Sequence, residues 1–372
     1  MFLVIPAEDD LTVTLVLPTG VRDRDEAAAA ALDPLARGVL TAAVGLDGTP
    51  LGAFLASRDA VAEALVGYET LTFRCCLPPG AVADCLPVFL EAVARPSLTV
   101  VNEQPYDARG SARSKLREML FAGHPLARPI PSHSGTPELS KVHQDVLASG
   151  TPVVVVAAPE TLVPGALEAL KSALPQASEP ACGVKREAPP TEVFSIGGLN
   201  LRAAAESARA RVAAGGIAAA RTEPAALALA VLTELFGDGE ASVLWHTLNT
   251  DFGIRCVLEA TYEGYQDCGL FQVELDLDTE WVATAESLIR ELLELTAAGR
   301  LGEAAFLTAR TAACERASAE ASDVPLASYR AAIEALDGSV PGDRAQRLEQ
   351  VTPEGLASAA ARVLRTYSVA VV

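Results

Sequence analysis

Two stretches in the two halves of the sequence show the same pattern, a helix followed by a short strand of mainly apolar residues. The first has a helix over 138–149 and the strand Val153–Ala158, and the second has a helix over 353–364 and the strand Tyr367–Val372. A pattern that recurs in this way indicates an internal duplication. At roughly 100 to 200 residues per domain, 372 residues also have room for two globular units. We therefore expect two α+β halves of similar length.

Between residues 175 and 190 the hydrophobic periodicity disappears and Pro, Glu, Lys and Ser dominate, which is typical of a linker. The sequence thus predicts an N-terminal domain over 1–178, a linker over 179–192 and a C-terminal domain over 193–372. Strands are expected at 11–17, 51–55, 68–77, 153–158, 193–196, 203–212, 256–262, 270–277 and 367–372. Helices are expected at 23–43, 81–94, 109–121, 138–149, 164–174, 225–236, 279–298, 302–321 and 353–364.

Charge and hydropathy argue against several classes of partner. The formal net charge is −19, and no basic run with interleaved aromatic residues is present to hold a polyphosphate. No apolar run approaches the roughly 20 residues that cross a bilayer. Seven cysteines, an odd number without a Cys-x-x-Cys pair, are typical of reduced thiols. We therefore expect a cytoplasmic protein with neither nucleic acid nor membrane as a partner.

Three segments carry a family resemblance. Residues 121–130 read FAGHPLARPI and resemble the GHPLGRP segment of the pitrilysin/insulinase (M16) zinc peptidases. Residues 235–245, LFGDGEASVLW, are similar to that family's LGGGxxSRLF, and residues 265–271, YQDCGLF, are similar to its Y-x-D-x-G-x-F. Near the start, Gly20, Arg22 and Glu26 resemble its G-x-R-x-E pattern before the first helix. With the matching order of elements, the likeness extends over nearly the whole chain.

This resemblance implies an α+β fold of the LuxS/M16-like metallohydrolase type. Two homologous α/β-sandwich domains are then expected, each with a mostly antiparallel sheet and helices packed on one face.

The catalytic motif of the family is H-x-x-E-H on the first helix, where two imidazoles hold zinc and the glutamate activates the bound water. In the corresponding helix of this chain, Asp33 and Arg37 replace the two histidines and Ala36 replaces the glutamate. An arginine puts a fixed positive charge where the dication would sit. Glu103 matches the family's distant ligand and is expected to be structural, with Arg37 as its suggested partner. The resemblance therefore implies no metal in this chain.

In two-subunit members of the family, the chain without zinc contacts substrate through an Arg and a Tyr after the glycine-rich loop. Here Asn249 stands at the position of that Arg and Cys256 at the position of the Tyr, with Arg255 adjacent. These departures put the usual contacts in doubt, although Asn249 can still hydrogen-bond and Arg255 can supply a charge. A structural role for the three residues is the alternative.

The four histidines lie at 124, 133, 143 and 246, without metal-ligand spacing, so packing or surface roles are expected. No G-x-S-x-G motif indicates a nucleophile, and residues 237–239 lack the Lys and Ser/Thr of a phosphate loop.

Three hypotheses remain open. The leading one is a non-catalytic subunit that pairs with an H-x-x-E-H chain, which supplies the zinc, and helps to bind an extended peptide such as a leader or precursor peptide of a natural product. Binding would use the edge of a β-sheet. The second is a stand-alone peptide-binding or scaffolding pseudopeptidase, possibly homodimeric. The third, an enzyme with unrelated chemistry, has no cluster of titratable residues in the sequence to support it.

Overall fold

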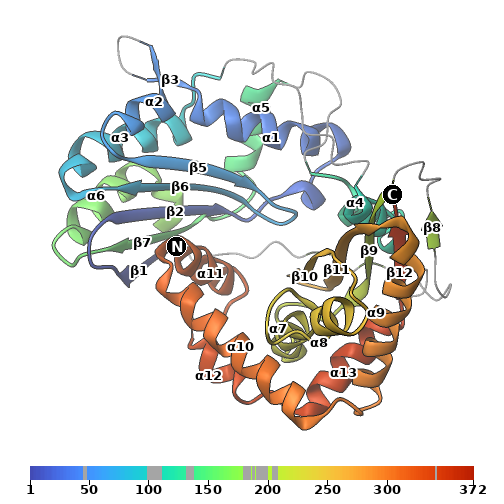
Figure 1. The fold of residues 1–372 in the computed structure, drawn as a ribbon. Helices are drawn as coiled ribbons and strands as arrows, with labels where there is room; N and C mark the ends of the chain where they lie inside the picture. The colour runs from blue at the N-terminus through green and yellow to red at the C-terminus, as the bar shows by residue number, and fades with distance from the viewer. Residues whose placement is uncertain are drawn as a thin grey trace. The chain divides into compact units, whose positions relative to one another are not determined.

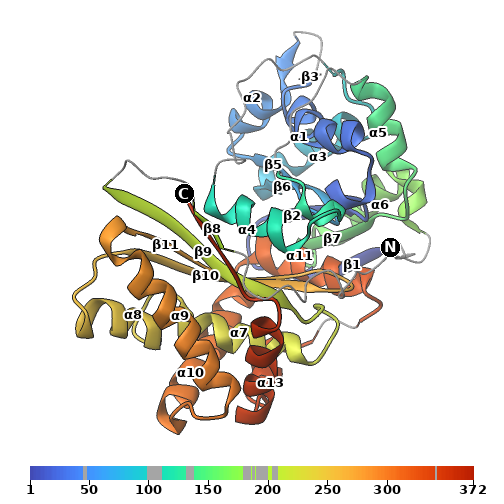
Figure 2. The ribbon, with the colours of Figure 1, turned by 90° about the vertical axis from the view of Figure 1, so that its right-hand side faces the viewer.

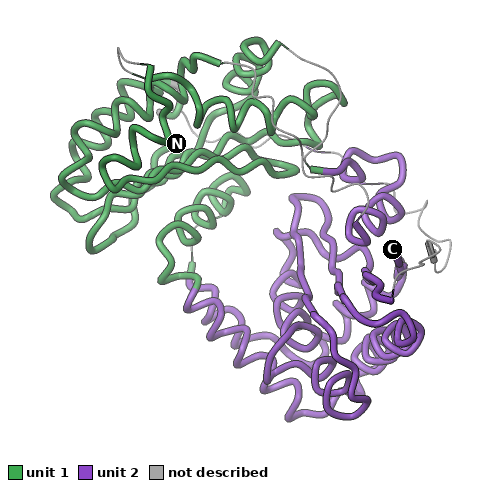
Figure 3. Tube along the Cα trace, turned by 45° about the horizontal axis from the view of Figure 1, so that its top comes forward, with its two compact units in different colours: residues 1–106, 130–185, 320–342 green, residues 107–129, 186–319, 343–372 purple. Residues whose placement is uncertain are grey.

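The computed structural model describes residues 1–44, 48–98, 111–130, 138–178, 186, 189, 200–202, 208–339 and 342–372. The chain forms two compact units, coloured separately in Figure 3. Unit 1 comprises Met1–Tyr106, Ile130–Lys185 and Glu320–Gly342, and unit 2 comprises Asp107–Pro129, Arg186–Ala319 and Asp343–Val372.

Each half of the sequence therefore gives one segment to the other unit, 107–129 to unit 2 and 320–342 to unit 1. The compact units do not coincide with the expected domains 1–178 and 193–372. Most of the expected linker, 179–192, lies outside the described residues.

The sheet of unit 1 has the strand order β1-β7-β2-β6-β5. Its strands are β1 (Phe2–Pro6), β7 (Val153–Ala158), β2 (Leu11–Leu17), β6 (Leu71–Leu77) and β5 (Val61–Val66). The pairing of β1 with β7 is parallel, and the other three pairings are antiparallel. Side chains alternate between the faces of a strand, so one face of β2 presents Leu11, Val13, Leu15 and Leu17 to the larger core of this unit.

That core face is covered by helices α1 (Glu26–Leu40), α2 (Leu51–Ala56), α3 (Val82–Ala94), α5 (Leu139–Leu147) and α6 (Val163–Ala173). Figure 1 shows α1 and α3 on one side of this sheet and α11 (Val324–Leu336) on the other. Helix α11 packs against β7 and β2. Two short strands, β3 (Ala43–Val44) and β4 (Thr49–Pro50), pair with each other.

The sheet of unit 2 has the order β10-β11-β9-β12-β8. Its strands are β10 (Val257–Gly264), β11 (Gly269–Asp278), β9 (Arg209–Ala218), β12 (Ser368–Val371) and β8 (Asn200–Arg202). Its core is built with α7 (Ala225–Phe236), α8 (Val243–His246), α9 (Val282–Ala297), α10 (Glu303–Ser322), α12 (Arg344–Leu348) and α13 (Pro353–Leu364). Helix α4 (Ala112–Leu120) packs against β9 and β12, on the side away from α9 and α13 in Figure 2.

The two sheets follow one plan. The pairing of β8 with β12 is parallel and the others are antiparallel, so β8, β12, β9, β11 and β10 match β1, β7, β2, β6 and β5 in order and direction. Helices α4 and α11 take matching places as well, each on the second face of a sheet. The predicted fold of two homologous α/β sandwiches with mostly antiparallel sheets is confirmed.

Some local predictions were wrong. Residues 51–55, expected as a strand, lie in helix α2. Strand β5 and helix α11 were not predicted. The strand expected at 203–212 is β9, displaced to Arg209–Ala218, whereas residues 193–196 lie outside the described part of the chain. In the described residues, the structure has no helix that combines the length and the apolar character needed to cross a membrane.

Candidate functional site

Helix α1, where the family motif would lie, is anchored at its N-terminal end to the turn between β5 and β6. The backbone N–H of Val21 donates to Gly67 O (3.0 Å) and that of Arg22 donates to Tyr68 O (3.0 Å). A Cβ at Gly20 would lie 2.4 Å from the backbone of Tyr68, so only glycine allows this close approach. The turn therefore fixes where α1 starts.

Two polar interactions complete the anchor. The Arg22 guanidinium forms a buried ion pair with Glu69 (2.8 Å). The Asp25 carboxylate caps α1 by accepting a hydrogen bond from the N–H of Ala28 (2.8 Å), which satisfies one free donor of the first turn. Because α1 also packs against β5, the positions that would carry the family's ligands are held beside that strand.

At those positions Asp33 and Arg37, one helical turn apart, form an ion pair with each other. Their side chains are 23% and 34% exposed, whereas Ala36 is buried at 3%. The three residues lie on one stretch of α1, and Asp33 is a partner of Arg37. Glu103, the suggested partner, lies outside the described residues.

This donor set does not fit zinc. Asp33 offers one carboxylate that is already paired, Ala36 has no donor atom, and Arg37 is a permanent cation. At an effective dielectric constant of 20, two unit charges 4 Å apart interact by about 4 kcal/mol, so a dication at that distance from Arg37 would be disfavoured by about 8 kcal/mol. Within the described residues, no group of three His, Cys, Asp or Glu side chains has the geometry of a metal site.

Strand β5, next to α1, is an end strand of the described sheet. Val61 and Leu65 are 63% and 48% exposed, and between them Glu63 forms an ion pair with the buried Arg74 of β6. These three side chains share the face of the sheet opposite the main core. An exposed end strand with apolar side chains can pair with another extended chain through its backbone.

The second set of predicted residues lies in unit 2. Asn249, in the π-helical turn Thr247–Asp251, donates to Trp245 O (3.1 Å). Burial raises the pKa of the Cys256 thiol, and a hydrogen bond with the Asn249 side chain opposes that rise. Arg255, between them in sequence, is exposed. The structure thus brings Asn249 and Cys256 together and leaves Arg255 at the surface.

The motif segments that carried the resemblance have clear structural roles. Ser242 is fully buried, accepts from the N–H of Trp245 (3.0 Å) and donates to Leu235 O (3.1 Å), so it closes the glycine-rich loop. His124 Nδ1 accepts from the N–H of Leu126 (3.2 Å) in the turn Pro125–Ala127. These hydrogen bonds explain the roles of Ser242 and His124 without any need for a bound ligand.

The other histidines differ in setting. His143 is buried, with its Nε2 2.8 Å from Val93 O, and burial lowers its pKa. The ring of His246 lies 3.1 Å from Glu240 O in an exposed position. His133 lies outside the described residues.

A polar network that the sequence did not reveal fixes α4 on the sheet of unit 2. Arg117 is buried, with Nη2 2.7 Å from Glu263 Oε2, and its Nη1 donates to Tyr265 OH (2.6 Å). Tyr265 OH in turn donates to Glu263 (2.7 Å). Arg113, one turn earlier in α4, pairs with Glu274. The only signal in the sequence was the spacing of Arg113 and Arg117 in a predicted helix, which does not name the partners.

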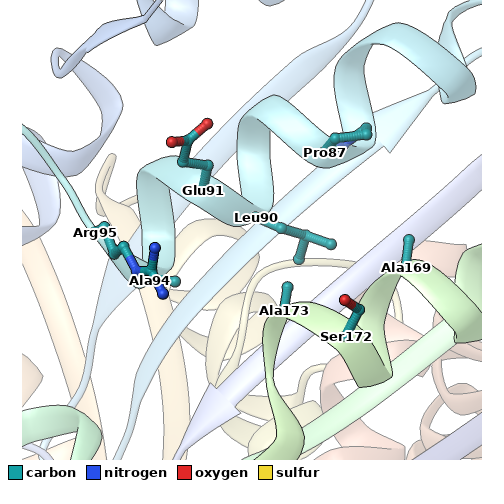
Figure 4. Close-up of a pocket in the computed structure, with 8 residues that line it drawn as sticks. All are labelled: Pro87, Leu90, Glu91, Ala94, Arg95, Ala169, Ser172 and Ala173. Carbon is teal, nitrogen blue, oxygen red and sulfur yellow. The ribbon is translucent and has the colours of Figure 1, made fainter.

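A groove of about 440 Å³ lies between α3 and α6 of unit 1. Figure 4 shows Leu90 of α3 facing Ala169 and Ala173 of α6 across it. Glu91 and Arg95 stand at its α3 side. None of the predicted site residues lines this groove, which belongs to the helix layer.

Comparisons with known proteins agree with this geometry. The model of the family described as "Peptidase M16 inactive domain" matches residues 139–313. The structure of a protease from Helicobacter pylori superposes with a TM-score of 0.79 at 13% identity, covering 100% of this chain and 96% of that one. The structure of a peptidase M16 inactive domain from Pseudomonas fluorescens gives 0.78 at 15% identity, covering 100% and 94%. No curated protein matches.

The matched segment runs from α5 into α10 and leaves out α1 and α4, while the two structural neighbours share the fold over the whole chain. No H-x-x-E-H motif occurs anywhere in the sequence. Residues 139–313 therefore match the part of the M16 peptidase family described as the inactive domain, and the whole chain shares the fold of the two structural neighbours.

Proposed function

We propose that this chain is the non-catalytic subunit of an M16-type zinc peptidase and works beside a second subunit that carries H-x-x-E-H. In this arrangement the second subunit supplies every zinc ligand and the general base. The present chain helps to hold an extended peptide, such as a leader or precursor peptide. The hydrolysis is then attack of a zinc-activated water in the second subunit on the peptide bond.

One observation carries this proposal: Asp33 and Arg37, at the positions where the resemblance would put the two histidines, form an ion pair. Because the charges of Asp33 and Arg37 balance each other, no metal ion is needed beside the Asp33 carboxylate. In this proposal α1 keeps its place in the M16-like fold but has no residues that bind zinc.

Strand β5 supports a role in binding the peptide. It is an end strand of the described sheet, packs beside α1, and exposes Val61 and Leu65. A peptide that extends the sheet would gain backbone hydrogen bonds, which demand little of its sequence, and apolar contacts with these two side chains. In unit 2, Asn249, Cys256 and Arg255 are proposed as further substrate contacts, with the exposed Arg255 available for a peptide carboxylate.

The test is co-purification followed by kinetics. The chain is expressed alone and with an H-x-x-E-H chain of the same genome, and complex formation is measured by size-exclusion chromatography with light scattering. We expect a one-to-one complex that hydrolyses fluorogenic peptides, and no hydrolysis by this chain alone. A stable homodimer that ignores the second chain but binds peptides would instead support the scaffolding role.

The peptide site is tested within that complex. Substituting Val61→Lys and Leu65→Lys places charges on the end strand, which disfavours pairing with another strand. Loss of two apolar cross-strand contacts corresponds to about a fivefold to tenfold rise in KM with kcat nearly unchanged. The matched control is Val4→Lys, an exposed apolar residue of the opposite end strand β1. Equal effects of the two changes would exclude β5 as the peptide site.

A further inference from the structure

Helices α4 and α11 take equivalent places on the two sheets, yet they are held in different ways. Helix α4 is pinned to unit 2 by ionic hydrogen bonds from Arg113 and Arg117 to the sheet. It also buries Leu116 and Leu120, and the ring of Phe121 packs edge-on against Tyr265 at 6.5 Å. Charge-assisted bonds of this kind are roughly twice as strong as neutral ones.

Helix α11 is held on the sheet of unit 1 mainly by apolar packing. The buried apolar side chains of this contact are Val16, Val153, Val155, Ala331, Ala332, Ala335 and Leu336, and Met1, Leu3, Ile5, Tyr329 and Ile333 are partly buried against them. Three of the four buried residues of the helix are alanines, which contribute little apolar area. Tyr329 OH, 3.3 Å from Thr70 Oγ1, provides one polar contact to the sheet side.

The same contact is bordered by buried polar atoms that lack a hydrogen-bond partner in the described part of the chain. They are Ser328 Oγ on α11 and, on the sheet, Thr14 Oγ1, Thr72 Oγ1 and Arg74 Nε. All four residues are more than nine-tenths buried.

Their positions follow from the pairing of the strands. Thr14 is two residues from Val16 on the same face of β2, and Thr72 pairs with Val16 across to β6. Ser328 is one turn before Ala331 and Ala332 on α11. The unpartnered atoms therefore share the face of the sheet on which α11 lies.

A buried polar group without a partner disfavours the buried state, because the same group forms hydrogen bonds to water when it is exposed. The contact of α11 with the sheet thus includes several polar groups that gain hydrogen bonds when the helix lifts off. The contact of α4 differs, since lifting this helix would break the buried ion pair of Arg117 with Glu263 and the hydrogen bond from Arg117 to Tyr265.

We propose that α11 is a releasable strap, meaning that Val324–Leu336 leaves and returns to the sheet of unit 1 while the main cores and the contact of α4 with the sheet of unit 2 stay formed. The joint between α10 and α11, at the start of the helix, allows such a movement. Helix α10 ends at Ser322, and Asp323 begins a new helix by accepting from the N–H of Leu326 (3.0 Å). Residue 323 therefore separates two helices, which the ion pair between Glu320 of α10 and Arg330 of α11 also links across the joint. The backbone hydrogen bonds within each helix stay intact when the two reorient.

The inference concerns this chain alone and does not depend on zinc, peptide or a second subunit. Native-state hydrogen exchange with mass spectrometry measures it directly, because local opening sets the exchange rate of each segment. We expect protection factors in α11 to be at least about tenfold lower than those in α4 and in β2. Protection of α11 equal to that of α4 would overturn the proposal.

A matched pair of substitutions tests the cause. Ser328→Ala removes one unpartnered buried hydroxyl, so exchange in α11 should slow about fivefold. The control is Ser318→Ala, the same change at an exposed position of α10, which should leave α11 unaffected. The proposal fails if Ser328→Ala does not slow α11 more than the control does. Arg117→Met should accelerate exchange in α4 and leave α11 unchanged.

Discussion

The buried Arg117 is the best point at which to test how α4 is held. The substitution Arg117→Met keeps most of the side-chain volume and removes the guanidinium. Arg117 is 5% exposed, and its partner Glu263 is 32% exposed. Breaking a fully buried ion pair costs about 3–5 kcal/mol, and because water reaches part of Glu263 we expect about 2–3 kcal/mol.

Both tryptophans, Trp245 and Trp281, belong to unit 2, so urea unfolding followed by tryptophan fluorescence reports this unit. The control is Lys115→Met in the same helix, which removes a surface pair with Glu118 and should cost less than about 0.5 kcal/mol. In a double-mutant cycle with Glu263→Gln, the coupling between the two positions should be about 1–3 kcal/mol.

The pH dependence supplies an independent check. Burial alone would raise the pKa of Glu263, but the Arg117 charge and the hydrogen bonds from Tyr265 and Arg117 outweigh it and hold the pKa below its ordinary value. A carboxyl whose pKa is lower in the folded state stabilises the fold above its unfolded pKa and loses that contribution as pH falls through the folded one. The difference between wild type and Arg117→Met should therefore shrink in acid. A cost no larger than that of Lys115→Met, with no coupling to Glu263, would show that the Arg117–Glu263 ion pair does not hold α4 on the sheet.

Three further predictions concern unit 1. Asp33→Ala removes a partly exposed ion pair and should change the free energy of unfolding by no more than about 0.5 kcal/mol, measured by urea denaturation followed by circular dichroism; a loss above about 2 kcal/mol would contradict the exposed setting of the pair. His143 is buried with a lowered pKa, so the unfolded chain binds more protons and stability should fall as pH drops below the ordinary histidine value, by at most about 1.4 kcal/mol per pH unit; His143→Gln should remove this slope, and an unchanged slope would assign it elsewhere. The triple change Asp33→His, Ala36→Glu and Arg37→His restores H-x-x-E-H on α1 and should bind zinc in equilibrium dialysis, whereas Arg37→His alone should not; a triple variant without zinc would show that the motif has been placed on the wrong residues.

Elements with strong local signals could be predicted from the sequence. The helix Pro353–Leu364 has a threonine cap and proline at its first position, and its predicted bounds agree with the structure. Strand β7 is a run of valines and alanines and was likewise assigned correctly. The run LGAFL at 51–55 is too short for periodicity to distinguish a strand from a helix, and it folded as α2.

Long-range features could not be predicted in this way. The exchange of α4 and α11 between the units depends on which sheet face has room for a helix, and hydrophobic periodicity carries no such information. Helix α11 was missed altogether, although Asp323 and Pro325 form a helix start signal. At the candidate site, the spacing of Asp33 and Arg37 was sufficient to place both on one face of α1, but their mutual ion pair required coordinates. The substrate contacts proposed at Asn249, Arg255 and Cys256 stay a prediction.

Zinc content and peptidase activity of the purified chain show whether it has zinc chemistry of its own. The protein is purified without chelator, its zinc is counted by inductively coupled plasma mass spectrometry, and hydrolysis of a mixed fluorogenic peptide set is followed with and without a chelator. We expect far less than one zinc per chain and no chelator-sensitive hydrolysis. One zinc per chain together with hydrolysis that a chelator abolishes would overturn the proposal of a non-catalytic subunit.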